Sequence, residues 1–266
     1  MIGGAQADGT TEANAASTVA PFNTNAPAEG VAIVQHVGDV ISVDNTFRDE
    51  EGKTVRIGDY FGKRPVVLML GYYECPMLCN QVLQGLLRTL KALEFQPGQE
   101  YEVVVVSIAP HETPLHALRK REAFLANLAT SGREITGGVH FLSSDEANVR
   151  KLADEVGFQY RYEEKTKQYA HAAGVMVLTP GAKLSRYFYG IDYPTRDMRF
   201  AIMDAANEKL GSVVDQVLLL CFHYDPTTGR YGLAIMRLVR TAGVLTVCGL
   251  AIFVTTMLRR ERKRLA

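Results

Sequence analysis

The sequence has no excess of charge of either sign, because 29 Lys and Arg residues balance 29 Asp and Glu residues. Because the chain as a whole is neither basic nor acidic, we expect neither a nucleic-acid partner nor a cationic partner. The chain of 266 residues is 47% apolar, which suits one domain of ordinary size plus appendages.

Cysteine is also scarce, with four residues at positions 75, 79, 221 and 248. That number is too small for a scaffold built from disulfides in a chain of this length, so any thiol chemistry is local. Residues 1–30 contain scarcely an aromatic side chain and lack the apolar block of a signal peptide. We expect this segment to be a flexible leader.

A single long apolar run lies near the C-terminus, where residues 241–258 contain no charged side chain. Together with the preceding residues it predicts a transmembrane helix over 238–258. The following segment, 259–266, is strongly basic and is expected to stay on the cytoplasmic side. The globular part would then lie on the periplasmic (extracytoplasmic) side of a membrane. A buried apolar C-terminal helix is the alternative.

The rest of the chain alternates between strand and helix patterns. Short alternating stretches within residues 40–55 predict a hairpin, and apolar runs then predict strands at 65–71, 101–108, 139–142 and 174–178, with a return strand at 183–189. Apolar residues at helical spacing predict helices at 76–95, 115–128, 144–157 and 195–210, the third of them starting at Ser144.

This order predicts an α/β protein with a thioredoxin-like fold, in which a central mixed sheet carries helices on both faces. We expect the domain to cover 31–211. A connecting segment, 212–237, then leads to the predicted membrane helix. Within 212–231 we expect a helical stretch, followed by a Cys-Phe-His-Tyr-Asp-Pro stretch from Cys221 and a turn that includes Gly229.

Cys75 and Cys79 lie where a predicted central strand ends and a helix begins. Residues four apart share one face of a helical turn, so both sulfurs can reach one atom. Unpaired N–H groups and the helix dipole at such an end favour thiolate, which acts as a nucleophile or a ligand. The pair therefore predicts a soft-metal or redox site. The alternative without such chemistry is a buried structural pair or a simple disulfide.

His171 is the best candidate for a third ligand, because it immediately precedes the predicted strand 174–178, which in this layout abuts the first helix. By itself the residue is weak evidence, since a lone histidine is more often a surface or core residue. The other histidines, His36, His111, His116 and His140, show no paired ligand spacing and receive no role.

These features together resemble the Sco/SenC family of copper-binding proteins. The matching features are Cys75-Pro-Met-Leu-Cys79 after an apolar strand, the stretch 107–114 (Ser-Ile-Ala-Pro-His-Glu-Thr-Pro) after the next strand, and His171. The resemblance covers roughly 31–210. It is strongest to bacterial members that carry a Cys-Phe-His-Tyr-Asp-Pro stretch and a C-terminal membrane anchor.

The resemblance implies a copper metallochaperone rather than an enzyme, with Cu(I) or Cu(II) held by Cys75, Cys79 and His171. It further implies assistance to the copper-bearing subunit of cytochrome c oxidase, and contact with other copper chaperones. Family members commonly carry proline and aspartate where this chain has Asn80 and Ala170. The missing acid affects copper affinity and the preferred oxidation state.

A membrane-anchored thiol-disulfide oxidoreductase is the alternative function, in which Cys75 attacks a substrate disulfide and Cys79 resolves the mixed disulfide. It would keep the cysteines of the oxidase copper site reduced. The CxxxC spacing and the added histidine suit metal geometry better than the CxxC of thioredoxin-type enzymes.

Three further sulfur-containing positions are weaker candidates. Met77 can supply a thioether, but a methionine in a helical turn more often packs into a core. Cys221 and His223 supply at most two ligands, so this stretch is expected to pack against the domain or dock a partner. Secondary copper binding or a mixed disulfide is the alternative. Cys248 lies in the predicted membrane helix, where we expect an apolar filler.

Overall fold

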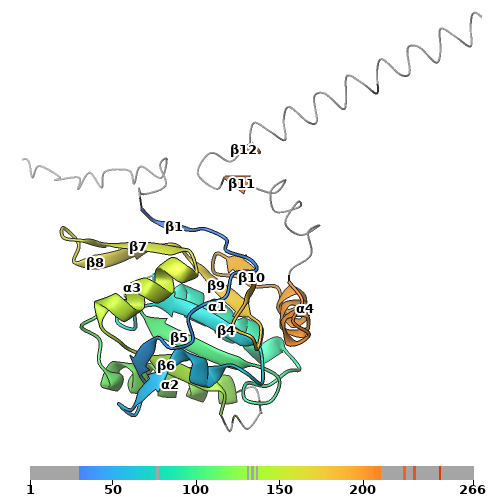
Figure 1. Cartoon of the computed structure of the whole chain (residues 1–266), viewed down its shortest axis with the longest axis horizontal. Helices are drawn as coiled ribbons and strands as arrows, with labels where there is room; N and C mark the ends of the chain where they lie inside the picture. Colours follow the sequence, from blue (N-terminus) through green and yellow to red (C-terminus); the bar gives the residue numbers. More distant parts are fainter. Residues whose placement is uncertain are drawn as a thin grey trace, which may run out of the picture.

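A computed structural model of the chain describes residues 30–75, 78–130, 132, 135, 137–210, 224–225, 230–231 and 246. Its centre is one twisted sheet with helices on both faces (Figure 1). The sheet order is β10-β9-β4-β5-β6, in which β4, β5 and β6 run parallel and β9 and β10 complete the sheet antiparallel. The predicted mixed α/β sheet is confirmed.

The five strands fall where the apolar runs predicted them, within one or two residues. They are β4 (Val66–Gly71), β5 (Glu102–Ser107), β6 (Val139–Leu142), β9 (Gly174–Leu178) and β10 (Leu184–Tyr189). Because β4 and β5 are buried on both faces, they consist of continuous apolar sequence rather than an alternation.

Two cores form because successive strand side chains point to opposite faces. On one face Val67 and Met69 pack with α1 (Leu78–Ala92), α2 (Pro114–Ala129) and α4 (Thr195–Ala206). On the other face the alternate residues of β4 pack with α3 (Glu146–Glu155), with the hairpin of β2 (Thr46–Arg48) and β3 (Thr54–Arg56), and with the short 3₁₀ helix η1 (Ile57–Tyr60).

A second, smaller sheet was not predicted from the sequence. It is antiparallel, with the order β1-β7-β8, and consists of β1 (Ala32–Ile33), β7 (Phe158–Glu163) and β8 (Gln168–His171). The six residues of β7 alternate aromatic and polar side chains and were the available sequence signal, whereas β1 and β8 have only two and four residues. The sheet matters because β8 ends at His171.

The start of α3 corrects one prediction in detail. Asp145, rather than Ser144, caps the helix, and its carboxylate accepts the backbone N–H of Asn148 at 2.9 Å. The hydroxyl of Ser144 instead donates to the Thr46 carbonyl at 2.9 Å, which fastens the β2–β3 hairpin to the loop before α3.

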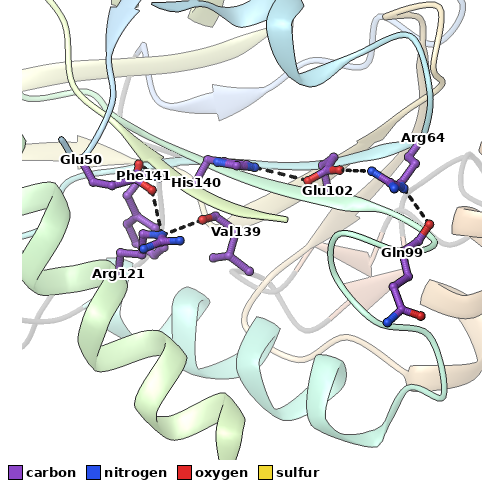
Figure 2. A network of polar contacts seen from close by, with 8 residues as sticks. All are labelled: Glu50, Arg64, Gln99, Glu102, Arg121, Val139, His140 and Phe141. Atoms are coloured by element: carbon purple, nitrogen blue, oxygen red, sulfur yellow. Dashed lines mark hydrogen bonds and ion pairs between the residues drawn. The ribbon is translucent and has the colours of Figure 1, made fainter. Parts of the chain in front are cut away.

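Polar contacts along β5 and β6 tie the outer parts to the sheet (Figure 2). Arg121 on α2 donates to the Glu50 carboxylate and to the Val139 carbonyl, both at 2.8 Å. Beside them, the Glu102 carboxylate accepts a hydrogen bond from the Arg64 guanidinium group at 2.7 Å and lies 3.3 Å from Nε2 of His140. The hairpin loop, α2 and two strands are thus connected by charged groups that satisfy one another.

Beyond α4, only a few residues are described. Tyr224–Asp225 (β11) pairs antiparallel with Arg230–Tyr231 (β12), on either side of the stretch that includes the predicted Gly229 turn. Among the described residues, no helix is long and apolar enough to cross a membrane. The predicted leader, connecting segment, membrane helix and basic tail otherwise lie outside the described residues and stay predictions, as do the roles considered for Cys221, His223 and Cys248.

Candidate metal centre

The two cysteines lie between the carboxyl end of β4 and the first turn of α1, as their sequence context predicted. Gly71 ends the strand, and a side chain there would lie 3.4 Å from the Cys79 sulfur. The end of the strand thus lies directly beside the thiol. Cys75 follows on a loop, and both residues are thiols rather than the two halves of a disulfide.

Backbone N–H groups point at both sulfurs, as expected for the beginning of a helix. The N–H of Cys79 donates to the Cys75 sulfur at 3.3 Å, and that of Tyr72 donates to the Cys79 sulfur at 3.5 Å. The predicted thiolate does not follow for Cys79. Its hydrogen bond with Cys75, and then burial, hold the pKa of the Cys79 thiol far above its usual range. These two effects outweigh the stabilisation of thiolate by the helix end, so the Cys79 thiol stays protonated until another group replaces the proton.

His171 reaches the same point from β8, 92 residues further along the chain. Its Nδ1 lies 2.8 Å from the Ala172 carbonyl, which can only accept a hydrogen bond. In the neutral ring, Nδ1 therefore carries the proton and Nε2 keeps its lone pair. Nε2 lies 2.6 Å from the Cys79 sulfur, so this lone pair faces the thiols.

The two sulfurs and one imidazole nitrogen all lie within 4.8 Å of one another. Cys75, Cys79 and His171 are 5%, 3% and 6% exposed, so only small parts of the three side chains reach the surface. Aromatic rings surround it. Tyr72 and Phe158 lie 6.2 and 5.8 Å from the His171 ring, measured between centroids.

This donor set fits a soft metal ion. Thiolate sulfur and neutral imidazole select Cu(I) or Zn²⁺ over hard cations, which prefer oxygen. Three donors suffice for a three-coordinate copper ion but leave a tetrahedral zinc site one ligand short. The sequence-predicted set of Cys75, Cys79 and His171 is thus brought together, while the suggested Met77 thioether lies outside the described residues.

The two departures from the family pattern occupy different surroundings. Asn80 donates its side-chain amide to the Cys75 carbonyl at 2.7 Å, so it contacts the site loop directly. Ala170 pairs with Arg161 across the β7–β8 hairpin, one residue before the histidine.

A second group of possible ligands, Glu74, His111 and Glu112, was not predicted from the sequence. Glu74 and His111 are exposed, while Glu112 is buried. The Glu112 carboxylate already accepts hydrogen bonds from the backbone N–H groups of Tyr73 and Glu74 and from the Ser107 hydroxyl. We therefore interpret Glu112 as a structural acceptor rather than as a metal ligand. The sequence signal for it was its place in the 107–114 stretch.

The fold and the cluster together define the class of protein, a thioredoxin-like domain that carries two thiols and an imidazole in one buried site. The family model described as SCO1/SenC matches residues 36–210, and the chain belongs to this family.

Solved structures agree on the fold. A proposed electron transfer protein from Aquifex aeolicus VF5 is 22% identical with a TM-score of 0.56, covering 64% of this chain and 95% of its own. Arabidopsis thaliana ScoI, solved with copper bound, is 14% identical with a TM-score of 0.51, covering 65% and 99%. A SCO1/SenC family lipoprotein from Bacillus anthracis is 17% identical with a TM-score of 0.50, covering 66% and 98%. The comparison with curated protein sequences found no match.

Proposed function

We propose that this protein binds one copper ion through Cys75, Cys79 and His171 and carries it to the copper centre of a membrane cytochrome oxidase. One observation carries the proposal, namely that two sulfurs and the lone-pair nitrogen of a tautomer-fixed histidine lie within 4.8 Å of one another. The copper-bound Arabidopsis relative supports the choice of metal, and family membership supports the choice of recipient.

Copper is the cargo in this proposal, and the site chemistry suits a cargo that must be released. Loading Cu(I) displaces thiol protons, because only thiolates bind the metal well. Three ligands leave the ion open to a further sulfur or nitrogen donor from a partner. A recipient can therefore exchange ligands stepwise without the ion passing through water.

The predicted membrane helix over 238–258 and basic tail over 259–266 support placing this exchange on the periplasmic (extracytoplasmic) side of a membrane. There the domain would be tethered near a membrane-bound oxidase. The expected recipient is the copper-bearing subunit, with other copper chaperones as donors and no role for nucleic acid.

A second function, thiol-disulfide exchange, is favoured by the closeness of the two thiols, whose sulfurs lie within 4.8 Å of each other. Cys75 would attack a substrate disulfide and Cys79 would displace the product thiol. The substrate disulfide would gain two electrons and two protons, and Cys75 and Cys79 would be left as a disulfide. The same pair can keep the oxidase copper-site cysteines reduced before copper arrives.

The test is copper binding by the purified full-length chain and by Cys75→Ala, Cys79→Ala and His171→Ala. The wild type should bind one Cu(I), and each substitution should weaken binding about tenfold or more, because a ligand is lost. In the Cu(II) form, a thiolate-to-copper absorption band should weaken or shift when either cysteine is removed, because one of the two sulfur ligands is lost.

His111→Ala is the matched control, since it removes an exposed imidazole close to the site and should leave copper affinity unchanged. If His171→Ala also leaves affinity unchanged while the dithiol rapidly reduces protein disulfides, the oxidoreductase function replaces the copper carrier.

A further inference from the structure

The loop that carries Cys75 is held from outside by polar groups that sequence analysis did not single out. Cys79 is fixed by α1, and His171 is fixed by β8 and its bond to Ala172. Cys75 lies outside both elements, on the loop between β4 and α1. What holds the peptide groups of residues 73–75 therefore decides where the Cys75 sulfur lies.

Glu112 binds the N–H side of this loop. Its carboxylate accepts the backbone N–H of Tyr73 at 2.9 Å and that of Glu74 at 2.8 Å. A third donor, the Ser107 hydroxyl at the end of β5, lies 2.5 Å away and anchors the carboxylate to the central sheet. Glu112 is only 4% exposed, so its charge is kept in the interior where it is satisfied by these donors.

Lys120 binds the carbonyl side of the same loop. Its ammonium group, on α2, donates to the Tyr73 carbonyl at 2.8 Å and to the Asn80 side-chain oxygen at 2.5 Å. The amide nitrogen of Asn80 in turn donates to the Cys75 carbonyl at 2.7 Å. Lys120 thus reaches Cys75 through one intervening side chain.

We propose that Glu112 and Lys120 are positioning residues that clamp the Cys75 loop and so keep its sulfur within reach of Cys79 and His171. The clamp consists of Glu112, Lys120 and Asn80. The Glu112 carboxylate binds two backbone N–H groups of the loop, and the Lys120 ammonium group binds a backbone carbonyl and orients Asn80. The arrangement of the three ligands is therefore formed before any ion binds. The choice of copper as the ion rests on the proposed function, whereas the clamp itself does not.

Preorganisation of this kind acts on affinity because a ligand that must first be ordered binds more weakly. Residues that orient metal ligands typically change metal affinity about 10-fold to 100-fold when removed. The same order acts on the two thiols themselves, since a disulfide closes more readily when its sulfurs are held together. Both properties can be measured separately.

The experiment compares Lys120→Met and Glu112→Gln with Arg119→Met and Glu122→Gln in the full-length chain. The controls remove the same charges from exposed positions on α2 that make no hydrogen bond or ion pair within the described part of the chain. Lys120→Met keeps most of the aliphatic stem. Glu112→Gln leaves one oxygen for three donors. Lys120→Arg, which keeps a charged donor, is the conservative rescue.

Two readouts are taken for each variant. The first is Cu(I) affinity together with the position of the thiolate-to-copper absorption band in the Cu(II) form. The second is copper-free, namely the equilibrium in which oxidised glutathione accepts two electrons and two protons from Cys75 and Cys79, giving their disulfide and two reduced glutathione molecules.

Lys120→Met and Glu112→Gln should each lower Cu(I) affinity about tenfold or more, shift the absorption band, and disfavour the Cys75–Cys79 disulfide about tenfold. The two control variants should change none of these, and Lys120→Arg should recover part of the loss. A purely structural contribution would lower the unfolding temperature while leaving band position and disulfide equilibrium unchanged.

If both clamp variants show wild-type affinity, band and disulfide equilibrium, the clamp proposal is wrong. Should Glu112→Gln fail to fold, the half-buried Lys120→Met alone decides the matter. If the wild type binds no copper, the proposed function is wrong. The clamp proposal is then still tested by comparing the glutathione equilibrium of the clamp variants with that of the wild type.

Discussion

At the scale of single residues, charges decide how the chain responds to its surroundings. Burial alone would raise the pKa of the Glu102 carboxyl, but hydrogen bonds from His140 and Arg64 outweigh it and hold that pKa below its usual range (Figure 2). A carboxyl whose pKa is lower in the folded state stabilises the protein above its unfolded-state pKa. That stabilisation disappears as the pH falls through the folded pKa.

Glu102→Gln should therefore lower the free energy of unfolding by about 1 kcal/mol at pH 7, because a partly exposed ion pair and its hydrogen bonds are lost. Urea unfolding from pH 7 to pH 3 is the measurement. The difference from wild type should shrink as the pH falls through the lowered pKa of the Glu102 carboxyl, because the wild-type carboxyl is then itself protonated.

Glu164→Gln is the control, because it removes an exposed carboxylate that has no ion pair within the described residues. A difference for Glu102→Gln that persists unchanged at pH 3 would contradict the electrostatic explanation and indicate a packing defect.

Sequence patterns alone located the cysteines but not their protonation. The position of Cys75 and Cys79 between a strand and a helix is a local property, and it was predicted. Whether Cys79 ionises depends on burial and on the facing Cys75 thiol, and these outweigh the local helix end.

At the scale of elements, α1 shows how close packing decides the choice of residue. Gly85 lies inside this helix, where a side chain would approach the Ile191 carbonyl oxygen to 2.0 Å. The same loop is bound by the hydroxyl of Thr89, which donates to the Tyr193 carbonyl at 2.7 Å. The glycine therefore lets the loop after β10 pack against the helix.

Gly85→Ala should lower the stability despite a better helix propensity. Alanine gains up to about 1 kcal/mol as a helix former, while forcing α1 and the loop apart costs about 1–3 kcal/mol. We expect the unfolding temperature to fall by a few degrees in thermal unfolding followed by circular dichroism.

Gln84→Ala, at the neighbouring exposed position, is the control and should leave the unfolding temperature nearly unchanged or slightly raised. A rise for Gly85→Ala equal to that of Gln84→Ala would show that the loop yields without cost.

Elements with strong periodicity were predicted well, and those without it were missed. The apolar run of β4 and the leucine stripe of α1 each repeat a pattern that fits one structure. The β7–β8 hairpin offers a shorter signal, since β7 alternates aromatic and polar side chains over only six residues and β8 has four. The apolar pattern therefore showed only the strand that follows His171, whereas this residue itself ends a strand.

At the scale of the whole molecule, one sheet supports two cores. Leu86 on α1 lies in one core and Leu68 on β4 in the other, and both are fully buried. Each strand contributes side chains to both cores in alternation, so a substitution that destabilises one core also destabilises the other. We expect the region 36–210 to unfold cooperatively.

Leu86→Ala and Leu68→Ala should each cost about 2–5 kcal/mol, because each leaves a cavity. In denaturant unfolding, circular dichroism and tyrosine fluorescence should still report one common midpoint for each variant. Leu115→Ala, whose side chain is 52% exposed, is the control and should change stability by less than about 0.5 kcal/mol. Separate midpoints for the two signals would contradict a single cooperative unit.

The sequence by itself determined the sheet strands, the four helices and the place of the CxxxC pair, because each depends on a repeat or a spacing within one short segment. It determined His171 only as the best of several histidines. The place of the residue before the predicted strand 174–178, together with the family resemblance, singled it out.

The tertiary structure decided the rest. It brought the His171 ring to Cys79 across 92 residues, fixed its tautomer on the Ala172 carbonyl, and set Glu112 and Lys120 against the Cys75 loop. These contacts join segments that no sequence period relates. They arise from how the second sheet and α2 pack on the central one, so only the folded chain specifies them.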